Sequence, residues 1–204
     1  MDHLFNTLSD VDVQKRLLYL YSLSESECTR NGKLGMEIGM AREKDLIAVL
    51  TYSMGFAVKS DIDNAETRDM EVHGLNVSIK HLSNKMGTPV KIKWTSADSA
   101  VEKDVHELIN GSDDSYPNLL IVYIHDNTIK IVCISSETNK NVIKRLQRNA
   151  FLIRSGNSRG IEYSKDAMKE LIEKKSFEIT ISNANLKNTI DPIKRRLKLL
   201  ESFG

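Results

Sequence analysis

The residues of this chain that are best suited to chemistry are an acid and a lysine in neighbouring strand-like segments. Asp69 begins the first segment, His73-Gly74 is a turn signal, and Lys80 lies near the end of the second segment. Strand residues two apart share a face, so Ser78 points the same way as Lys80. A tight hairpin would bring this pair close to Asp69. A carboxylate and an ammonium group that meet at one spot can hold a divalent metal against a phosphate, so the hairpin predicts a nuclease centre.

Magnesium is the metal that these residue types favour. It prefers oxygen ligands and is often held by one or two carboxylates together with waters and phosphate oxygens. Asp69 is the first candidate ligand, and the helical stretch before the hairpin offers Glu43 as the second, with Glu37 as its competitor. The backbone carbonyl of Ile79 could add a further ligand. Lys80 would orient the attacking water or help to deprotonate it.

A plainer interpretation of the same hairpin is an ordinary ion pair between two strands. Asp69 and Lys80 would then contribute at most about 1 kcal/mol to folding if they are exposed. Glu43 would be a solvated helix residue. Under that interpretation the domain binds DNA or another partner and cleaves nothing, so the two interpretations make opposite predictions about cleavage.

The order of Asp69, the turn and the triplet Ser78-Ile79-Lys80 resembles the signature of the PD-(D/E)XK nuclease superfamily. In that signature an acid precedes an acid-x-lysine triplet across two strands. Two later segments, 91–95 and 156–164, are similar to segments of type II restriction endonucleases in particular. The resemblance covers roughly residues 34–165 of the chain.

This sequence departs from the superfamily signature at two positions. Arg68 stands where proline usually precedes the first acid, and Ser78 replaces the acid of the triplet. Some restriction enzymes use a helix glutamate in place of that acid, and Glu43 would fit this variation. Ser78 stays among the candidate catalytic residues, while Lys80 supplies the cation.

The resemblance implies an α/β (α+β) fold in which helices flank a mixed central β-sheet with the αβββαβ order of restriction endonucleases. It also implies a Mg²⁺-dependent type II site-specific deoxyribonuclease that cuts both strands of double-stranded DNA at a short site. Such sites are usually symmetric, and a protein two-fold axis matches a palindrome, so we expect a homodimer. The alternatives are a repair or structure-specific nuclease on the same core and a non-catalytic DNA-binding domain.

Four residues outside the hairpin are candidates for contact with the DNA backbone or with a base step. Lys91 and Lys93 alternate with apolar residues, which predicts that they share one strand face, toward DNA or toward solvent. Met36 and Met40 lie near the start of the helical stretch that carries Glu43. Apolar wedges can enter a base step from the minor groove, although methionine more often fills a core.

A segment rich in arginine, asparagine and glycine follows residue 147. Arginine binds guanine bidentately, asparagine binds adenine, and glycine lets the backbone come close to a duplex. This composition predicts a DNA-recognition loop, with a plain surface loop as the alternative. The candidate contacts in the segment are Arg148, Arg154, Asn157 and Arg159.

Periodicity and turn signals predict the elements that position these residues. Helical patterns cover 9–28, with Ser9 or Asp10 as the N-cap, and 34–55, while 59–67 has a loop composition. The continuous apolar run 118–124 is typical of a central strand and is followed by a hairpin partner at 128–135. Four further helices are predicted: one that ends at residue 110, and others at 139–148, 164–175 and 190–203. Three further strands are predicted at 90–95, 161–163 and 177–181.

Length and composition are consistent with a single nuclease domain over 1–204. We divide it into an N-terminal helical element at 1–33, a catalytic core at 34–135, and recognition and C-terminal additions at 136–204. The net charge is only +1, so DNA must be met by a local patch. Cys28 and Cys133 belong to no Cys/His cluster, which predicts free thiols and no zinc site. Without a signal pattern or an apolar run of membrane-spanning length, a cytoplasmic protein with no membrane partner is expected.

Overall fold

A computed structural model describes residues 1–32, 36–59, 69–82, 87–93, 101–112, 115–125, 128–154 and 160–182. Its helices are α1 (Asp2–Ser9), α2 (Val11–Arg30), α3 (Met36–Met54), α4 (Val101–Asn110), α5 (Ser136–Leu146) and α6 (Lys165–Glu173), with 3-10 turns η1 (Gly55–Ala57) and η4 (Gln147–Ala150). Its strands are β1 (Val58–Lys59), β2 (Met70–Val72), β3 (Leu75–Leu82), β4 (Val90–Lys93), β5 (Asn118–His125), β6 (Thr128–Ile134), β7 (Phe151–Arg154), β8 (Gly160–Tyr163) and β9 (Phe177–Ser182).

The central sheet has six strands in the order β1-β2-β3-β5-β6-β9. The β3–β5 pair is parallel, and the other neighbouring pairs of this sheet are antiparallel. The apolar run of β5 lies in the interior of the sheet because both of its faces are covered, which explains why it lacks an alternating pattern. The predicted mixed sheet flanked by helices is therefore confirmed.

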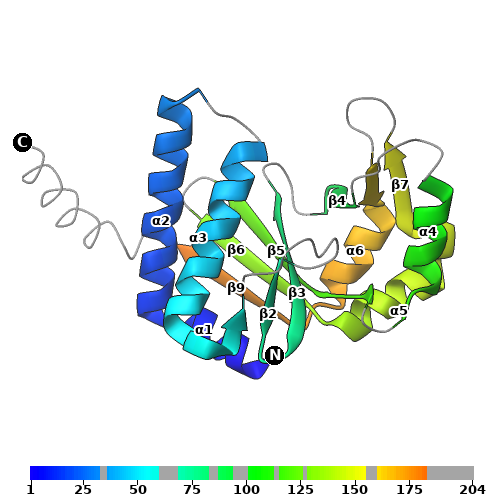
Figure 1. Cartoon of the computed structure of the whole chain (residues 1–204), viewed down its shortest axis with the longest axis horizontal. Coiled ribbons are helices and arrows are strands. Elements are labelled where there is room, and N and C mark those ends of the chain that lie inside the picture. Colours follow the sequence, from blue (N-terminus) through cyan, green and yellow to red (C-terminus); the bar gives the residue numbers. More distant parts are fainter. Residues whose placement is uncertain are drawn as a thin grey trace, which may run out of the picture.

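Each face of the central sheet carries its own layer of helices (Figure 1). On one face, α1, α2 and α3 pack against β2, β3 and β6 through a core that contains Leu17, Leu46, Leu50, Val77 and Ile79. On the other face, α4, α5 and α6 form a second core with the alternate residues of the same strands. Residues that are adjacent on β3 therefore face different helical layers, which separates Lys80 from Ile79 and His81.

Side-chain caps start three of the helices where the sequence offers an acid or a serine. Asp10 accepts hydrogen bonds from the backbone N–H groups of Asp12 (2.8 Å) and Val13 (3.0 Å) and so begins α2, as predicted. Ser164 caps α6 in the predicted place. Ser135 caps α5, so this helix begins before the predicted Asn139. The helix α1 has no side-chain cap bond, which is one reason why no signal for it was found in the sequence.

The predicted hairpin is present as β2 and β3. Its register pairs Met70 with Val77 and Val72 with Leu75. His73 and Gly74 have φ values of 49° and 79°, the left-handed conformation that two-residue hairpin turns require. The two-residue turn at His73 and Gly74 sets this register.

The predicted third strand of the core is wrong in its location. β4 lies in a separate three-stranded sheet with the order β4-β8-β7, and not in the central sheet. β3 already has β2 on one side and β5 on the other, so no edge of β3 is left for β4 to join. The αβββαβ core is instead formed by α3, β1, β2, β3, α4 and β5. β1 occupies part of the stretch that was predicted to be a loop from residue 59.

Lys91 and Lys93 do not share a face of β4, which corrects the prediction from simple alternation. Lys91 pairs with Glu162 of β8 but Lys93 pairs with Ile161, and the register shifts between them. Glu162 and Ile161 are adjacent on β8, so their side chains point to opposite faces of the small sheet. A residue paired with each of them points to the same face as its partner, so Lys91 and Lys93 lie on opposite faces. The cause is a β-bulge at Ile92, which sequence periodicity does not reveal.

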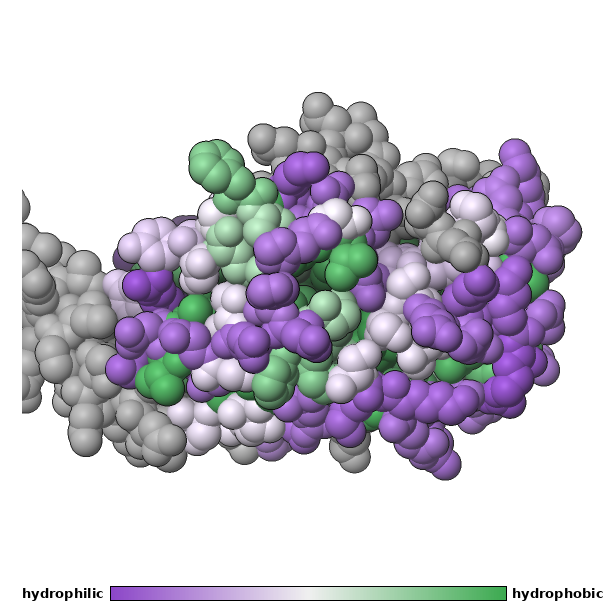
Figure 2. Space-filling view, turned by 90° about the horizontal axis from the view of Figure 1, so that it is seen from below, coloured by the Kyte–Doolittle hydropathy of each residue, from purple (hydrophilic) through white to green (hydrophobic). Residues whose placement is uncertain are grey.

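Three further observations concern the cysteines, the helices and the surface. Both cysteines are buried and free of disulfides. No helix in the described ranges has the length and apolar character needed to cross a bilayer. Polar residues cover much of the face seen in Figure 2, with apolar residues emerging among them. Trp94, Asn157, Arg159 and the predicted helix at 190–203 lie outside the described residues.

The close approach of β8 to β4 gives a prediction for stability. Gly160 has a φ of +144°, and a Cβ atom there would lie 2.7 Å from the carbonyl oxygen of Lys93. We expect Gly160→Ala to lower the free energy of unfolding by about 1–3 kcal/mol, measured by urea denaturation.

Gly39 of α3 is the matched control, because a Cβ atom there meets no heavy atom within 4 Å. Gly39→Ala should leave the free energy of unfolding unchanged or raise it by up to about 1 kcal/mol, since alanine favours a helix over glycine. Equal losses of stability in the two variants would contradict the steric explanation.

Candidate active site

Asp69 is held at the end of the hairpin by contacts with three consecutive residues of β3. Its Oδ2 accepts hydrogen bonds from Ser78 Oγ (2.9 Å) and from the Ile79 backbone N–H (2.5 Å). Lys80 Nζ lies 3.6 Å from the same oxygen, and the Asp69 and Lys80 side chains are each 22% exposed. The Asp69 backbone N–H donates to the Val77 carbonyl at 2.9 Å, which places the acid one residue before β2. The two predicted side chains therefore meet, at a half-buried position that substrate can reach.

The backbone carbonyl of Ile79 points to the strand edge on which Asp69 lies. In an extended strand the N–H and C=O groups of one residue point to the same strand edge. The Ile79 N–H points to Asp69, so the Ile79 carbonyl faces the gap where β2 has ended. The three β3 contacts of Asp69 all use Oδ2, so its Oδ1 atom is not engaged by them.

Glu43 of α3 is the predicted second carboxylate. Burial raises the pKa of Glu43 to about 7, with a further upward effect from the charge of Asp69 and a downward effect from Lys80. These couplings place Glu43 within electrostatic reach of both hairpin residues. Glu37, its predicted competitor, lies in the first turn of α3 and is exposed. The geometry thus favours Glu43 over Glu37 as the helix carboxylate.

The donor set at this site suits a hard divalent cation. It offers the Asp69 and Glu43 carboxylates and the Ile79 carbonyl, which are all oxygen atoms, as Mg²⁺ prefers. No group of three or more acidic, histidine or cysteine side chains in the described ranges could hold a metal. Two carboxylates are nevertheless the usual number where water and phosphate oxygens complete the shell.

Ser78 orients the carboxylate of Asp69. Its side chain is buried, with 3% exposed, and its hydroxyl donates to Asp69. Ser78 therefore stabilises the ionised acid but cannot replace the missing carboxylate of the family triplet, since a hydroxyl carries no charge.

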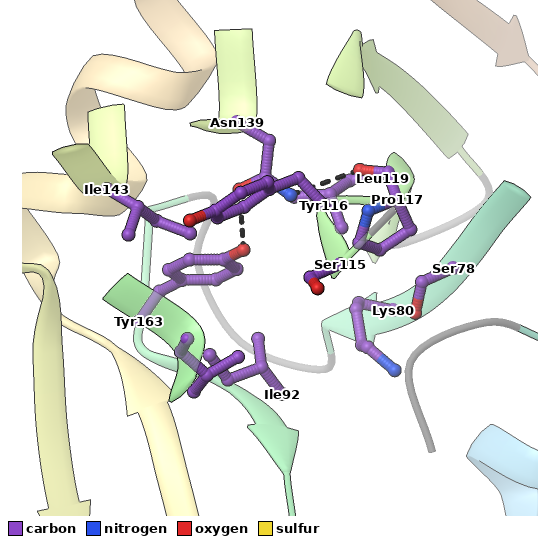
Figure 3. Close-up of a pocket in the computed structure, with 11 residues that line it drawn as sticks. Ser78, Lys80, Ile92, Ser115, Tyr116, Pro117, Leu119, Asn139, Ile143 and Tyr163 are labelled. Carbon is purple, nitrogen blue, oxygen red and sulfur yellow. Dashed lines mark hydrogen bonds between the residues drawn. The ribbon is translucent and has the colours of Figure 1, made fainter. Parts of the chain in front are cut away.

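A small cavity of about 30 Å³ lies behind Ser78 and Lys80 (Figure 3). On its far side, Tyr163 donates a hydrogen bond to Asn139 Oδ1 at 2.6 Å, and Asn139 Nδ2 donates to the Pro117 carbonyl at 3.0 Å. Burial raises the pKa of Tyr163, so this hydroxyl keeps its proton. The sequence analysis missed Asn139 and Tyr163; the only signal was a polar residue in a helix whose other inward residues are apolar.

Several of the predicted DNA contacts on β4 and the small sheet pair with acidic side chains. Lys93 Nζ pairs with Asp104 of α4 at 2.9 Å, so its charge is partly neutralised. Arg148 and Arg154 are about half exposed and pair with Glu102 and Glu162 at 3.4 Å and 3.2 Å. Lys91 is half-buried. These ion pairs partly neutralise the charges of Lys93, Arg148 and Arg154.

Met40 lies on the surface of α3, with 53% of its side chain exposed. The core-filling alternative is therefore wrong for Met40. Met36 begins α3 one turn earlier, and it is described only as part of the helix. An exposed methionine on the helix that carries Glu43 is compatible with a wedge that meets DNA.

Behind the hairpin, the opposite face of β3 meets a polar cluster that the sequence did not reveal. Tyr21 Oη lies 3.1 Å from His81 Nε2, joining α2 to β3. Burial, with the positive charges of Arg42 and Lys80, lowers the pKa of His81 to about 3, so this ring is neutral. Burial is also the main cause of the raised pKa of Tyr21. These side chains lie on three elements far apart in sequence, so no local pattern predicts their contact.

The chain is similar to restriction endonucleases over nearly its whole length. A family model described as "Restriction endonuclease ThaI" matches residues 4–201. A solved structure described as "Restriction endonuclease in complex with substrate DNA" aligns with a TM-score of 0.73 and 25% sequence identity, over 88% of each chain. No curated protein sequence matches the chain significantly.

Proposed function

The chain belongs to the restriction endonuclease ThaI family, and from this premise we propose that it is a Mg²⁺-dependent enzyme that cuts double-stranded DNA at a short palindromic site. Family and structural neighbour identify it as a type II site-specific nuclease. Restriction endonucleases generally use divalent metal ions. The choice of Mg²⁺, the symmetry of the site and the roles of individual residues are our proposals.

The observation that carries the proposal is the convergence of Glu43, Asp69 and Lys80 from one helix and one hairpin. Asp69, Glu43 and the Ile79 carbonyl would hold the metal. A bound Mg²⁺ would polarise the scissile phosphate and lower the pKa of a water molecule. Lys80 would orient the attacking water through its ammonium group and stabilise the negative charge that develops on the phosphate. Ser78 would keep the Asp69 carboxylate in place through its hydrogen bond.

Recognition of DNA would use residues on both sides of this centre. Lys91 and Lys93 would contact the backbone. Base contacts would come from the segment after residue 147, and Met36 and Met40 of α3 would form an apolar wedge against a base step. The candidate base contacts are Arg148, Arg154, Asn157 and Arg159. The structural neighbour is bound to its substrate DNA, which supports a double-stranded DNA partner for this chain.

A homodimer would match the symmetry of a palindrome and place one catalytic centre on each strand. Each protomer would be a single nuclease domain. Residues 1–33 would support α3, residues 34–135 would form the catalytic core, and residues 136–204 would supply recognition. The packing of α1 and α2 against the face of the sheet that also binds α3 supports this division.

The proposed function is tested by incubating the protein with phage DNA, with Mg²⁺ and with EDTA. We expect discrete fragments with Mg²⁺ and intact DNA with EDTA, because the carboxylate pair alone cannot activate water. Mapping the fragment ends would give the site. A smear of fragments would favour a repair or structure-specific nuclease, and intact DNA with every divalent metal tried would overturn the proposal.

A further inference from the structure

We infer that Tyr21, His81 and Arg42 are positioning residues that set the distance between Glu43 and the Asp69–Lys80 pair, and that they thereby tune the affinity of the site for a divalent cation. This inference rests on the proposed function. None of the three residues is assigned a role by the family signature, and none touches the space where substrate would react.

The two halves of the site lie on different elements. Asp69 and Lys80 belong to the hairpin and are fixed by local contacts, whereas Glu43 belongs to α3. Apolar contacts hold α3 on the sheet through Leu46, Val49 and Leu50. Such contacts are non-directional, so they do not by themselves fix the axial position of a helix over a strand.

Hydrogen bonds, which are directional, involve the sequence neighbours of Lys80 and of Glu43. His81 follows Lys80 on β3 and points to the opposite face, where its Nε2 lies 3.1 Å from the hydroxyl of Tyr21 on α2. Tyr21 is buried, with 3% exposed, and its ring makes an edge contact with His81 at a centroid distance of 5.8 Å. The hydrogen bond thus ties α2 to the residue next to the catalytic lysine.

On the other side, α2 is tied to the part of α3 that carries Glu43. Arg42 precedes Glu43 and its Nη2 donates to Glu25 of α2 at 3.0 Å. Ser24 of α2 donates to Asp45 of α3 at 2.6 Å. The Nε atom of Arg42 is buried without a hydrogen-bond partner in the structure, so the guanidinium is placed by the Glu25 contact and by its surroundings.

These contacts link β3 to α2 and α2 to α3, so the strand of Lys80 and the helix of Glu43 are connected through α2. A helix displaced by a fraction of a turn would carry Glu43 away from Asp69. Residues that orient metal ligands from behind typically change metal affinity or activity by about 10–100-fold when they are removed. Tyr21 is itself part of the apolar core between α2, α3 and the sheet, so a test must remove its hydroxyl and keep its ring.

Tyr21→Phe tests the inference, since it removes one hydroxyl and keeps the ring. We expect the Mg²⁺ concentration for half-maximal cleavage to rise by about tenfold, with kcat at saturating Mg²⁺ and KM for DNA nearly unchanged. Calorimetric titration of Ca²⁺ into the complex of the full chain with DNA should show a parallel loss of affinity without turnover. Tyr19→Phe is the matched control, because Tyr19 is a half-buried tyrosine of the same helix that lines a groove with Arg16 of α2 and Tyr52 of α3.

Two further variants separate positioning from folding. His81→Gln, which keeps a hydrogen-bond acceptor for Tyr21, should restore most of the metal affinity that His81→Leu loses. Ser24→Ala should weaken Ca²⁺ binding in the same direction if Tyr21→Phe does not fold. A Tyr21→Phe protein with a lowered Tm and unchanged Mg²⁺ and Ca²⁺ dependence would overturn the inference. Absence of metal binding and cleavage in the wild-type protein would instead overturn the proposed function.

Discussion

Lys80→Ala is expected to lower the rate of DNA cleavage by about 10³-fold while binding to DNA persists. The ammonium group lies 3.6 Å from Asp69 Oδ2. Removal of a group that stabilises transition-state charge or assists proton transfer typically costs about 10²–10⁴-fold in rate. Asp69 keeps its hydrogen bonds from Ser78 and Ile79 in this variant, so the hairpin should remain folded. Cleavage is measured on phage DNA with Mg²⁺, and binding by mobility shift in EDTA.

Lys59→Ala is the control for loss of a positive charge. Lys59 lies on β1, next to the same hairpin, and pairs with Glu71 at 2.9 Å, with 71% of its side chain exposed. Its removal should change cleavage by less than about threefold, because exposed ion pairs contribute little. A Lys80→Ala protein that cleaves within tenfold of wild type would contradict the role of this lysine. It would favour the interpretation of Asp69 and Lys80 as a plain ion pair.

Asp69→Asn should lower the rate of DNA cleavage by about 10³-fold or more, at least as much as Lys80→Ala, with little change in the free energy of unfolding. The asparagine oxygen can still accept the hydrogen bonds from Ser78 and Ile79, so the local structure is retained. The charge and the second carboxylate oxygen are lost, and with them a ligand of the proposed metal, whose effect on the barrier is several kcal/mol. DNA binding in EDTA should be equal or tighter, because a negative charge near phosphate is removed.

Glu71→Gln is the matched control for Asp69→Asn. Glu71 lies on β2 two positions after Asp69 and pairs with Lys59. Neutralising it removes the same charge from the same hairpin but leaves the three β3 contacts of Asp69 intact. Cleavage and Mg²⁺ dependence should be close to those of wild type. If Glu71→Gln and Asp69→Asn lost activity equally, the effect would come from the overall charge of the hairpin and not from a metal ligand.

Local signals in the sequence predicted those parts of the fold that local physics determines. The β2–β3 hairpin, the Asp10 cap of α2 and the buried strand β5 each have a turn, a cap or an apolar run of their own. β1 was missed because a two-residue strand carries no periodicity. The place of β4 was wrong because sheet membership depends on which strand edges remain free, and this is a property of the whole fold.

In the candidate site, too, local sequence signals predicted some residues, whereas others depend on the three-dimensional packing. Asp69 and Lys80 could be paired from the sequence because a short hairpin joins them, and the structure brings them together. The choice of Glu43 over Glu37 needed the position of α3 on the sheet, which the three-dimensional packing supplies. Tyr21, Arg42 and His81 could not be linked by any pattern, since three separate elements carry them. The register shift between Lys91 and Lys93 likewise could not be predicted from the alternating sequence pattern, which placed both lysines on one face.

The parallel pairing of β3 with β5 also determines the order in which the catalytic centre can form during folding. Asp69 and Lys80 lie in a local hairpin, which forms within microseconds in isolated peptides. Strand β5 pairs with β3 on the side opposite to β2. This pairing requires the chain to close a long loop that contains β4 and α4, and the loss of entropy on closure precedes the favourable contacts. The hairpin is thus a local nucleus that gains its rigidity late, when β5 docks and the sheet closes around it.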